Sequence, residues 1–318
     1  MSLKIVFLSR YQNRVFRGVE SHIFELSKRL KKKFQVDIFS EKDADSLTKI
    51  LKGKYDFVIP ANGRVQSFKA GLGRLFSSYK TLIVGHAGIG RDDIWNLIGT
   101  FPDIFVALTE SQFKWAKKIA WKTKVTKIPN GIDLEKFSPT GQKADINLEA
   151  PIILSVGALE WYKNHDFTIK AVSRLMRGSL LIIGKGSQKR DLEKLGKMLL
   201  GDSRFKIIDA NYGDMPSYYR ACDLFTLPSW DREAFGIVYL EALATNLAVI
   251  APDDESRKEI IGNGGILFDP SNIDAFVKAL NMSLELNWDN KPRHQAEKFS
   301  WEDIALQYEK LFVQELKK

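Results

Sequence analysis

The chain has 318 residues, of which 44% are apolar and 27% charged, so we expect a globular protein of two ordinary-sized domains. Its single cysteine, Cys222, excludes an intramolecular disulfide framework, and no apolar run reaches the roughly 18 residues that a membrane-spanning helix needs. The net charge of +9 is concentrated early in the chain: residues 1–150 carry 26 Lys and Arg against 15 Asp and Glu, whereas the remainder carries 22 against 24.

Two lysine-rich clusters carry much of this positive charge: residues 28–33, and residues 114–127, where Trp115 and Trp121 are interleaved. A charge run of this kind is often no more than a solvated helix face. The alternative is a basic surface that contacts an anionic membrane or a phosphorylated acceptor. No nucleic-acid recognition motif accompanies the charge, and we therefore predict no nucleic-acid partner.

The first part of the chain alternates short apolar runs with helical patterns, which is typical of a parallel sheet covered by helices. Six strands are expected, at residues 3–8, 35–39, 55–59, 81–84, 104–108 and 125–128. The first run is too short for a signal peptide. Gly18 lies at the turn into the first helix, where a missing side chain lets a ligand approach the backbone. His86 follows the fourth strand, at the edge where open α/β sheets bind ligands. A purely structural role is the alternative for both residues.

A polar linker at residues 138–149 separates two domains, which we place at residues 1–140 and 150–300. Strands of the second domain are expected at residues 152–156, 180–183, 204–208, 224–227 and 247–250. The Gly-x-Gly at residues 184–186 follows the second of these strands, and it is a weak phosphate-binding motif when taken alone.

The stretch from residue 224 to residue 252 has the pattern strand, loop, helix, strand, and its loop and first helical turn carry two acidic residues. If the helix starts near Phe235, the amides of the first turn lack intrahelical partners and favour an anion; these are the amides of Ala234, Phe235, Gly236 and Ile237. Glu233 precedes them and Glu241 lies about two turns further on, roughly 12 Å away. This pattern suits a ligand with hydroxyl groups at both ends and phosphates between. A surface helix with two glutamates is the simpler alternative.

The full context of this stretch resembles the signature of the retaining GT-B glycosyltransferases of family 4, the glycosyl transferases group 1. The matching residues are Pro228-Ser229, Glu233, Phe235-Gly236 and Glu241, supported by Ile128-Pro129-Asn130-Gly131 with Asp133 and by Gly265-Ile266-Leu267-Phe268. The resemblance implies an α/β protein of the GT-B fold, with two facing Rossmann-like domains, parallel sheets and an interdomain cleft. It also implies that the last helix, within residues 301–318, packs back on the N-terminal domain.

The resemblance assigns roles to individual residues. Glu233 would contact the donor sugar, Lys163 would stabilise the departing diphosphate, and His86 would lie close to the sugar. Glu241 would hold the ribose hydroxyls, and the amides of residues 234–237 would bind the diphosphate. The other expected donor-binding residues are Gly18, Gly157, Gly184, Lys185 and Tyr212, where Tyr212 either stacks on the base or packs internally. The family's arginine is replaced by Ala158, so that Lys185 or Arg232 would have to supply any second cation.

The predicted activity is transfer of a sugar, with retention, from a UDP- or GDP-linked donor to an acceptor hydroxyl in glycan or glycolipid biosynthesis. No Asp-x-Asp motif stands at a strand end, so we predict no metal and no cofactor besides the nucleotide-sugar substrate. The expected acceptor is a glycan or lipid-linked glycan, and the expected location is cytoplasmic, with peripheral contact to an anionic membrane through the basic N-terminal domain. The alternatives are a nucleotide-sugar epimerase on the same scaffold and a non-catalytic basic binding protein. The sequence leaves the nucleotide base, the sugar, the acceptor, the linkage and the oligomeric state open.

Overall fold

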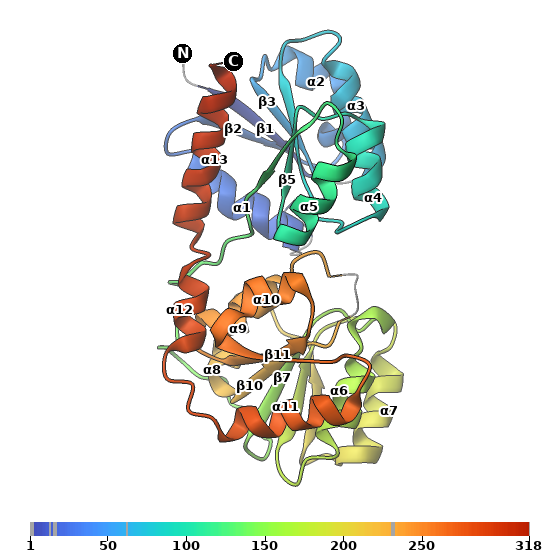
Figure 1. Cartoon of the computed structure of the whole chain (residues 1–318), viewed down its shortest axis with the longest axis vertical. Helices are drawn as coiled ribbons and strands as arrows, with labels where there is room; N and C mark the ends of the chain where they lie inside the picture. The colour runs from blue at the N-terminus through green and yellow to red at the C-terminus, as the bar shows by residue number, and fades with distance from the viewer. Residues whose placement is uncertain (1–2, 13, 15–17, 62, 230–232, 318) are drawn as a thin grey trace. The chain divides into compact units, whose positions relative to one another are not determined.

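The computed structural model describes residues 3–12, 14, 18–61, 63–229 and 233–317, with the backbone alone at Arg91. The chain folds as two units: unit 1 comprises Met1–Gly131 and Trp301–Lys318, and unit 2 comprises Ile132–Ser300. Each unit contains one six-stranded parallel sheet with helices on both faces (Figure 1). The prediction of two Rossmann-like α/β domains is therefore confirmed, whereas the cleft between them stays a prediction.

The sheet of unit 1 has the strand order β2-β1-β3-β4-β5-β6, so the order reverses beside β1. Its strands are β1 (Lys4–Leu8), β2 (Gln35–Phe39), β3 (Phe57–Pro60), β4 (Lys80–Val84), β5 (Ile104–Ala107) and β6 (Lys124–Lys127). The described residues of β3 and β5 are buried throughout, which explains why the sequence shows continuous apolar runs there rather than alternation. All six strands match the predicted runs to within three residues.

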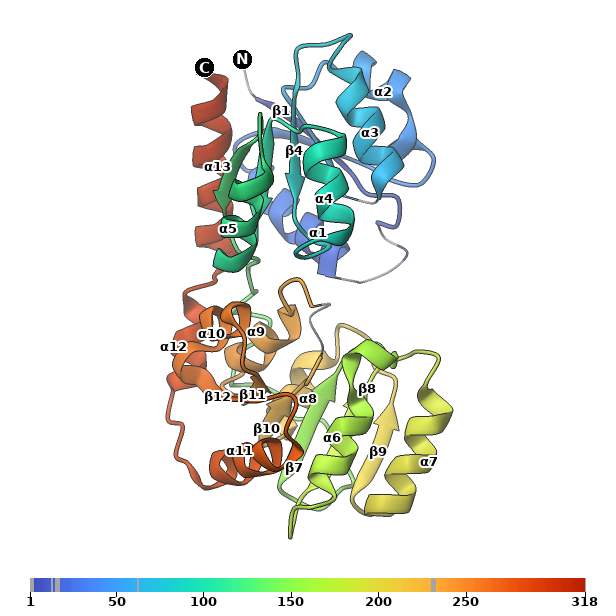
Figure 2. The same cartoon turned by 45° about the vertical axis from the view of Figure 1, so that its right-hand side comes forward.

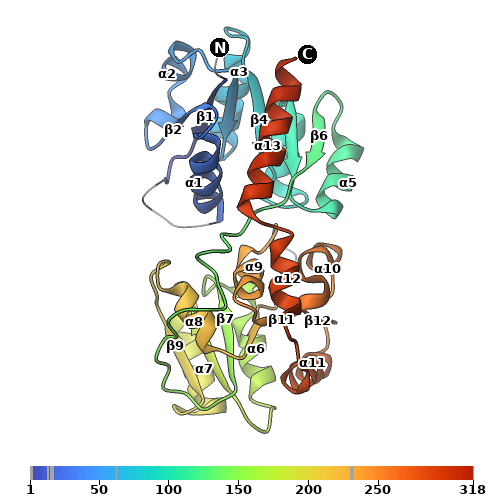
Figure 3. The same cartoon turned by 90° about the vertical axis from the view of Figure 1, so that its left-hand side faces the viewer.

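Helices cover both faces of this sheet. One layer consists of α2 (Leu47–Lys52), α3 (Arg64–Gly73), α4 (Arg91–Ile94), which continues into the π-helix η2 (Trp95–Gly99), and α5 (Glu110–Ile119), as Figure 2 shows. The short 3-10 helix η1 (Asp43–Asp45) precedes α2. The other layer consists of α1 (Gly18–Leu30) and α13 (Trp301–Leu316), which lie side by side (Figure 3). Ion pairs hold α13 in unit 1, with Arg29 at 2.8 Å from Glu302 and Lys33 at 2.6 Å from Glu309.

The sheet of unit 2 has the strand order β12-β11-β10-β7-β8-β9. Its strands are β7 (Ile152–Val156), β8 (Ser179–Ile183), β9 (Phe205–Ile208), β10 (Leu224–Thr226), β11 (Ala248–Pro252) and β12 (Gly265–Phe268). The sequence did not predict β12 as a strand, because it starts with glycine. A Cβ atom at Gly265 would lie 1.9 Å from the carbonyl oxygen of Val249, so the close approach of the two backbones requires that glycine.

The helices of unit 2 cover both faces of its sheet (Figure 1), and a core of buried aliphatic and aromatic side chains lies between the strands and α6, α7 and α11. These helices are η3 (Trp161–Lys163), α6 (His165–Val172), α7 (Lys189–Leu200), α8 (Met215–Ala221), α9 (Ile237–Ala244), α10 (Glu255–Ile261), η4 (Gly262–Gly264), α11 (Ile273–Glu285) and α12 (Lys291–Glu297). The polar linker lies on unit 2, where Arg220 donates to the carbonyl oxygen of Gln142 at 2.9 Å. Within the described ranges, no helix combines the length and the apolar composition needed to cross a membrane.

Candidate functional site

The carboxyl ends of β7, β8 and β10 are neighbours in the sheet of unit 2, and their loops form the base of the candidate site. Gly157 follows β7 and Gly184 follows β8. A Cβ atom at Gly184 would lie 1.9 Å from the carbonyl oxygen of Gly157, and one at Gly186 would lie 2.4 Å from that of Leu159. These glycines are therefore needed for the two loops to pack against each other, whether or not a phosphate binds there.

Lys163 and Glu233 form an ion pair across two of these loops. Lys163 comes from η3, after β7, and Glu233 comes from the loop after β10; their side chains are only 16% and 18% exposed. Burial alone would lower the pKa of Lys163, but the Glu233 carboxylate, helped by Tyr239 and Tyr162, outweighs it, and the net pKa is raised. Two of the three predicted catalytic residues are thus in contact, with the lysine held in its charged form.

The turn after Glu233 depends on Gly236, which has a φ of +83° and precedes the first residue of α9. A Cβ atom there would lie 2.5 Å from the ring of Tyr239, so glycine is required for both conformation and space. The sequence predicted that the helix starts near Phe235, but the helix begins at Ile237. Phe235 is buried and packs against Phe299 at 6.2 Å between ring centroids. The amides that a helix start offers to an anion are therefore those from Ile237 onward, while Ala234 and Phe235 belong to the loop.

Glu241 lies in α9, and its carboxylate is almost fully buried. The hydroxyl of Tyr219 donates a hydrogen bond to it at 2.8 Å. Burial raises the pKa of Glu241 to about 7, against the opposing effects of Tyr219 and Lys136. Lys136 also lies over the ring of Tyr212, with its Nζ atom 3.4 Å from the ring centroid. Glu241, Tyr212 and two residues that the sequence analysis missed, Lys136 and Tyr219, therefore belong to one cluster.

Arg257, another residue that the sequence did not indicate, holds Ser229, which is the last described residue before Glu233. Arg257, in α10, is 5% exposed and donates to Ser229 through both its carbonyl oxygen, at 2.9 Å, and its hydroxyl, at 2.8 Å. It also donates to the Tyr239 hydroxyl at 3.1 Å and pairs with Asp254. Nothing in the local sequence distinguishes Arg257 from a surface arginine paired with Asp254, because Ser229 and Tyr239 are distant in the chain.

Lys185 lies apart from the Lys163–Glu233 pair. Its side chain is 78% exposed, and its Nζ atom lies 2.7 Å from Asp209. Arg232, the other cation considered in place of Ala158, lies outside the described residues. In the described part of unit 2, Lys163 is therefore the cation that the loops bring to Glu233.

The predicted residues of unit 1 are Gly18, at the start of α1, and His86, after β4. A Cβ atom at Gly18 would meet nothing within 4 Å, so packing does not require that glycine. The ring of His86 lies against His22, 4.8 Å between centroids, and Nδ1 of His22 lies 2.8 Å from Oδ1 of Asn130. Burial lowers the pKa of His22 to about 4, and burial together with His22 lowers the pKa of His86. Both rings are therefore neutral at physiological pH, and His22 contacts both Asn130 and the ring of His86.

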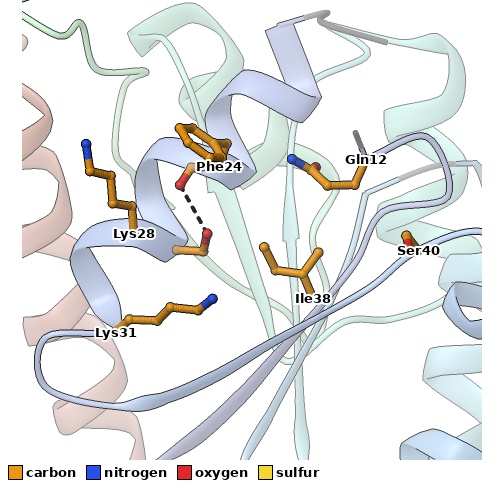
Figure 4. A pocket seen from close by; sticks show the side chains of 7 residues that line it. Gln12, Phe24, Lys28, Lys31, Ile38 and Ser40 are labelled. Atoms are coloured by element: carbon orange, nitrogen blue, oxygen red, sulfur yellow. Dashed lines mark hydrogen bonds between the residues drawn. The ribbon is translucent and has the colours of Figure 1, made fainter. Parts of the chain in front are cut away.

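Unit 1 also contains a pocket of about 360 Å³ that the sequence did not predict (Figure 4). It lies between the outer side of α1 and the edge strand β2. Ser27 donates a hydrogen bond there to the carbonyl oxygen of Phe24 at 3.1 Å. Lys28 and Lys31 show no carboxylate partner in the described part of the chain. The residues that line the pocket are Gln12, Phe24, Ser27, Lys28, Lys31, Ile38 and Ser40.

The described ranges contain no evident metal site, because no group of three or more His, Cys, Asp or Glu side chains is arranged there to hold a metal ion. Independence from metal and from any cofactor stays a prediction.

Two Rossmann-like units, each built on a six-stranded parallel sheet, place the chain in the class of doubly wound α/β proteins. Within that class, residues 139–300 match the model of the family Glycosyl transferases group 1. The match spans half of the chain, and the chain belongs to this family. The resemblance on which the sequence analysis relied is therefore confirmed.

Two curated relatives and two solved structures define the comparison further. The chain is 35% identical over 188 residues to N-acetylgalactosamine-N,N'-diacetylbacillosaminyl-diphospho-undecaprenol 4-alpha-N-acetylgalactosaminyltransferase of Campylobacter jejuni, covering 55% of this chain and 50% of the relative. It is 28% identical over 173 residues to UDP-Gal:alpha-D-GlcNAc-diphosphoundecaprenol alpha-1,3-galactosyltransferase of Escherichia coli, covering 49% and 44%. The matches thus span about half the length of these relatives.

Among solved structures, sucrose-phosphate synthase of Thermosynechococcus elongatus aligns with a TM-score of 0.82 at 19% identity, covering 99% of both chains. Anabaena HepE, solved in complex with UDP-glucose, aligns with a TM-score of 0.80 at 16% identity, again covering 99% of both chains. At these identities the likeness establishes the fold alone.

Proposed function

We propose that this protein is a retaining glycosyltransferase that moves a sugar from a UDP- or GDP-linked donor to an acceptor hydroxyl. The observation that carries the proposal is the Lys163–Glu233 ion pair, which lies directly before the start of α9 in a chain of the glycosyl transferases group 1 family. A positive charge, the amides of a helix start and a carboxylate therefore lie close together, and these are the groups that would bind a sugar diphosphate.

Each group has a defined task in the proposed reaction. Lys163 and the first amides of α9 stabilise the negative charge that develops on the diphosphate as its bond to the sugar breaks. Glu233 accepts hydrogen bonds from sugar hydroxyls and keeps Lys163 charged. Glu241 holds the ribose, and Tyr212 lies next to it as a platform for the base. The resemblance assigns His86 a place close to the sugar, where its neutral ring would donate to or accept from a sugar hydroxyl. Retention is inferred from the family resemblance.

The acceptor we propose is a lipid-linked glycan presented at an anionic membrane surface. Two observations support it. The Campylobacter and Escherichia relatives are named for sugars linked to diphospho-undecaprenol. The first 150 residues of this chain carry the excess of basic residues that an anionic surface attracts.

A nucleotide panel tests the donor site. Unfolding temperature should be measured with UDP, GDP, ADP, CDP and dTDP, each at about a hundred times a plausible dissociation constant. The bound nucleotide should then stabilise the protein by about 2.7 kcal/mol, which corresponds to a shift of several degrees. One diphosphate should stand out, and its sugar esters should then be screened for transfer by mass spectrometry. If no diphosphate shifts the transition, the proposed donor site is wrong.

Nucleotide affinity should rise with pH because of Glu241. Because the pKa of Glu241 is raised to about 7 in the folded protein, the folded state favours the protonated carboxyl. The stability that this carboxyl adds is fully present below its ordinary pKa of 4.5 and is lost as the pH rises through about 7. Ribose hydroxyls donate best to the ionised form. The dissociation constant measured by calorimetry should therefore fall about tenfold between roughly pH 6 and pH 8.

The matched control for this pH profile is Glu241→Gln. It removes the titrating carboxyl but keeps the shape and one acceptor for Tyr219, so that the remaining slope reports the phosphates of the nucleotide. Equal slopes in the variant and the original protein would contradict a role of Glu241 at the ribose.

A further inference from the structure

The helix α3 of unit 1 presents its apolar side to solvent and its small and polar side to the protein. Its buried residues are Gln66, Ser67, Ala70 and Gly73. Its exposed residues, with the turn that follows, include Val65, Phe68, Leu72, Leu75 and Phe76, whose exposed fractions run from 41% to 76%. A helix of a water-exposed layer normally shows the opposite arrangement.

Specific contacts fix α3 in this orientation. A Cβ atom at Gly73 would lie 2.0 Å from the hydroxyl of Tyr79, so only glycine fits there. The hydroxyl of Tyr79 in turn donates to the carbonyl oxygen of Ala70 at 2.7 Å. The side chain of Gln66 accepts from the amide of Ala61 at 2.9 Å and donates to the carbonyl oxygen of Ala44 at 3.3 Å. The helix therefore cannot rotate to bury its apolar side without breaking this packing.

The adjoining segment extends the apolar surface. η2 packs beside α3 in the same layer, and Arg74 ties the two together by donating to the carbonyl oxygens of Thr100, at 3.1 Å, and Phe101, at 2.8 Å. Four large side chains of this segment are 39% to 49% exposed: Ile94, Trp95, Ile98 and Phe101. We call these four residues, together with the five of α3 and its turn, the α3–η2 face.

Unpaired lysines border the α3–η2 face. α5 packs against η2 and exposes Lys114, Lys117 and Lys118. None of these lysines pairs with a carboxylate in the part of the chain that the structure describes. Trp121, just after α5, is 78% exposed, with Lys122 over its ring at 4.6 Å. Apolar residues, tryptophans and lysines are the composition of a surface that lies at a lipid–water interface.

We propose that the α3–η2 face, with the lysines of α5, docks unit 1 onto an anionic lipid bilayer. The apolar side chains enter the boundary between headgroups and acyl chains, and the lysines contact anionic headgroups. A second copy of the chain fits less well, because a two-fold interface centred on this face would bring the lysine-rich borders of both copies toward one another. The inference rests on the membrane contact included in the proposed function, but it is independent of the sugar-transfer chemistry.

Vesicle binding of the full chain tests the proposal. The protein should co-sediment with mixed phosphatidylcholine and phosphatidylglycerol vesicles and much less with phosphatidylcholine alone. Phe68→Ser with Leu72→Ser and Phe76→Ser should weaken binding by about tenfold or more. Lys114→Glu with Lys117→Glu and Lys118→Glu should weaken it by about a hundredfold, since each lysine near an anionic surface contributes about fivefold. Acyl-chain brominated lipids should quench tryptophan fluorescence, and Trp95→Phe should reduce that quenching.

The matched control reverses the same number of charges in the layer that covers the opposite face of the sheet, with Lys28→Glu, Lys31→Glu and Lys32→Glu. It should retain vesicle binding. If the control variant lost vesicle binding to the same extent, net charge and not the α3–η2 face would drive binding. Absence of binding to anionic vesicles would overturn the proposal directly. So would a dimer in sedimentation that the serine variant dissociates.

All altered side chains are exposed, so unfolding temperatures should stay unchanged. Transfer to a short water-soluble acceptor should persist in the serine and glutamate variants of the α3–η2 region, which separates failure of docking from failure of the proposed activity.

Discussion

Glu233→Gln should lower sugar transfer by about 10²–10³-fold while nucleotide affinity changes by no more than about twofold. The amide keeps the size of the carboxylate and can still meet a sugar hydroxyl, but it removes the negative charge that Lys163 contacts. Lys163 then loses the partner that raises its pKa, and the sugar loses its strongest acceptor. Nucleotide binding depends mainly on the α9 amides, Glu241 and the base platform, which the substitution leaves in place, and Lys163 stays available to the diphosphate. Single-turnover transfer and calorimetric nucleotide binding, measured side by side, give the two readouts.

Glu285→Gln is the matched control, since it removes the same charge from an exposed position of α11 in the same unit. It should leave both readouts unchanged. A variant at Glu233 that loses transfer and nucleotide binding together, with a lowered unfolding temperature, would show that the ion pair merely supports the loop. A variant that retains transfer would remove Glu233 from the reaction.

Much of this architecture could be predicted from the sequence because buried parallel strands leave a simple pattern. Apolar runs bounded by turn residues located eleven of the twelve strands, and they placed Gly157, Gly184 and His86 correctly at strand ends. The exception, β12, has glycine where its backbone approaches β11 closely, which hides the strand signal. Local patterns also misplaced the start of α9 by two residues, since the decisive feature is the positive φ of Gly236.

Contacts between distant residues left no pattern to follow. Lys136, Tyr219 and Arg257 reach the candidate site from three different segments, and only the fold brings them to Glu241 or to the Ser229 loop. Lys185 shows the converse: it follows β8, as the sequence predicts, but its side chain pairs with Asp209, so its contact with a phosphate stays a prediction. Sequence spacing identifies the strand end on which a residue lies, whereas the direction of a long side chain depends on charges elsewhere in the fold.

The inverted helix α3 shows a further limit. Periodicity identifies an apolar side of a helix, but it does not say which side faces the protein. Here the choice depends on Gly73 fitting against Tyr79 and on Gln66 bonding two backbone groups, and both contacts involve residues outside the helix. A pattern that would ordinarily predict a core-facing stripe instead supplies a surface for another molecule.

Arg257→Met should destabilise unit 2 by about 3 kcal/mol, because each buried acceptor that loses its donor costs about 1–3 kcal/mol. The substitution leaves the Ser229 carbonyl and hydroxyl and the Tyr239 hydroxyl without their donor, and leaves Asp254 without its charged partner. The unfolding temperature should fall by on the order of 10 °C.

The neighbouring residue provides the control for Arg257. Lys258 lies on the same helix and pairs with Asp253 at 2.7 Å, but its side chain is 59% exposed, so Lys258→Met should change the unfolding temperature little. Because Arg257 fixes both Ser229 and Tyr239, whose ring packs beside Gly236 in the turn after Glu233, its loss should also reduce transfer at temperatures where the variant is still folded. A saturating nucleotide should recover part of the lost stability, since it binds the folded state alone. If Arg257→Met and Lys258→Met had equally small effects, the buried arginine would not be what holds the loop, and the geometry of Glu233 would have to depend on Gly236 and Tyr239 instead.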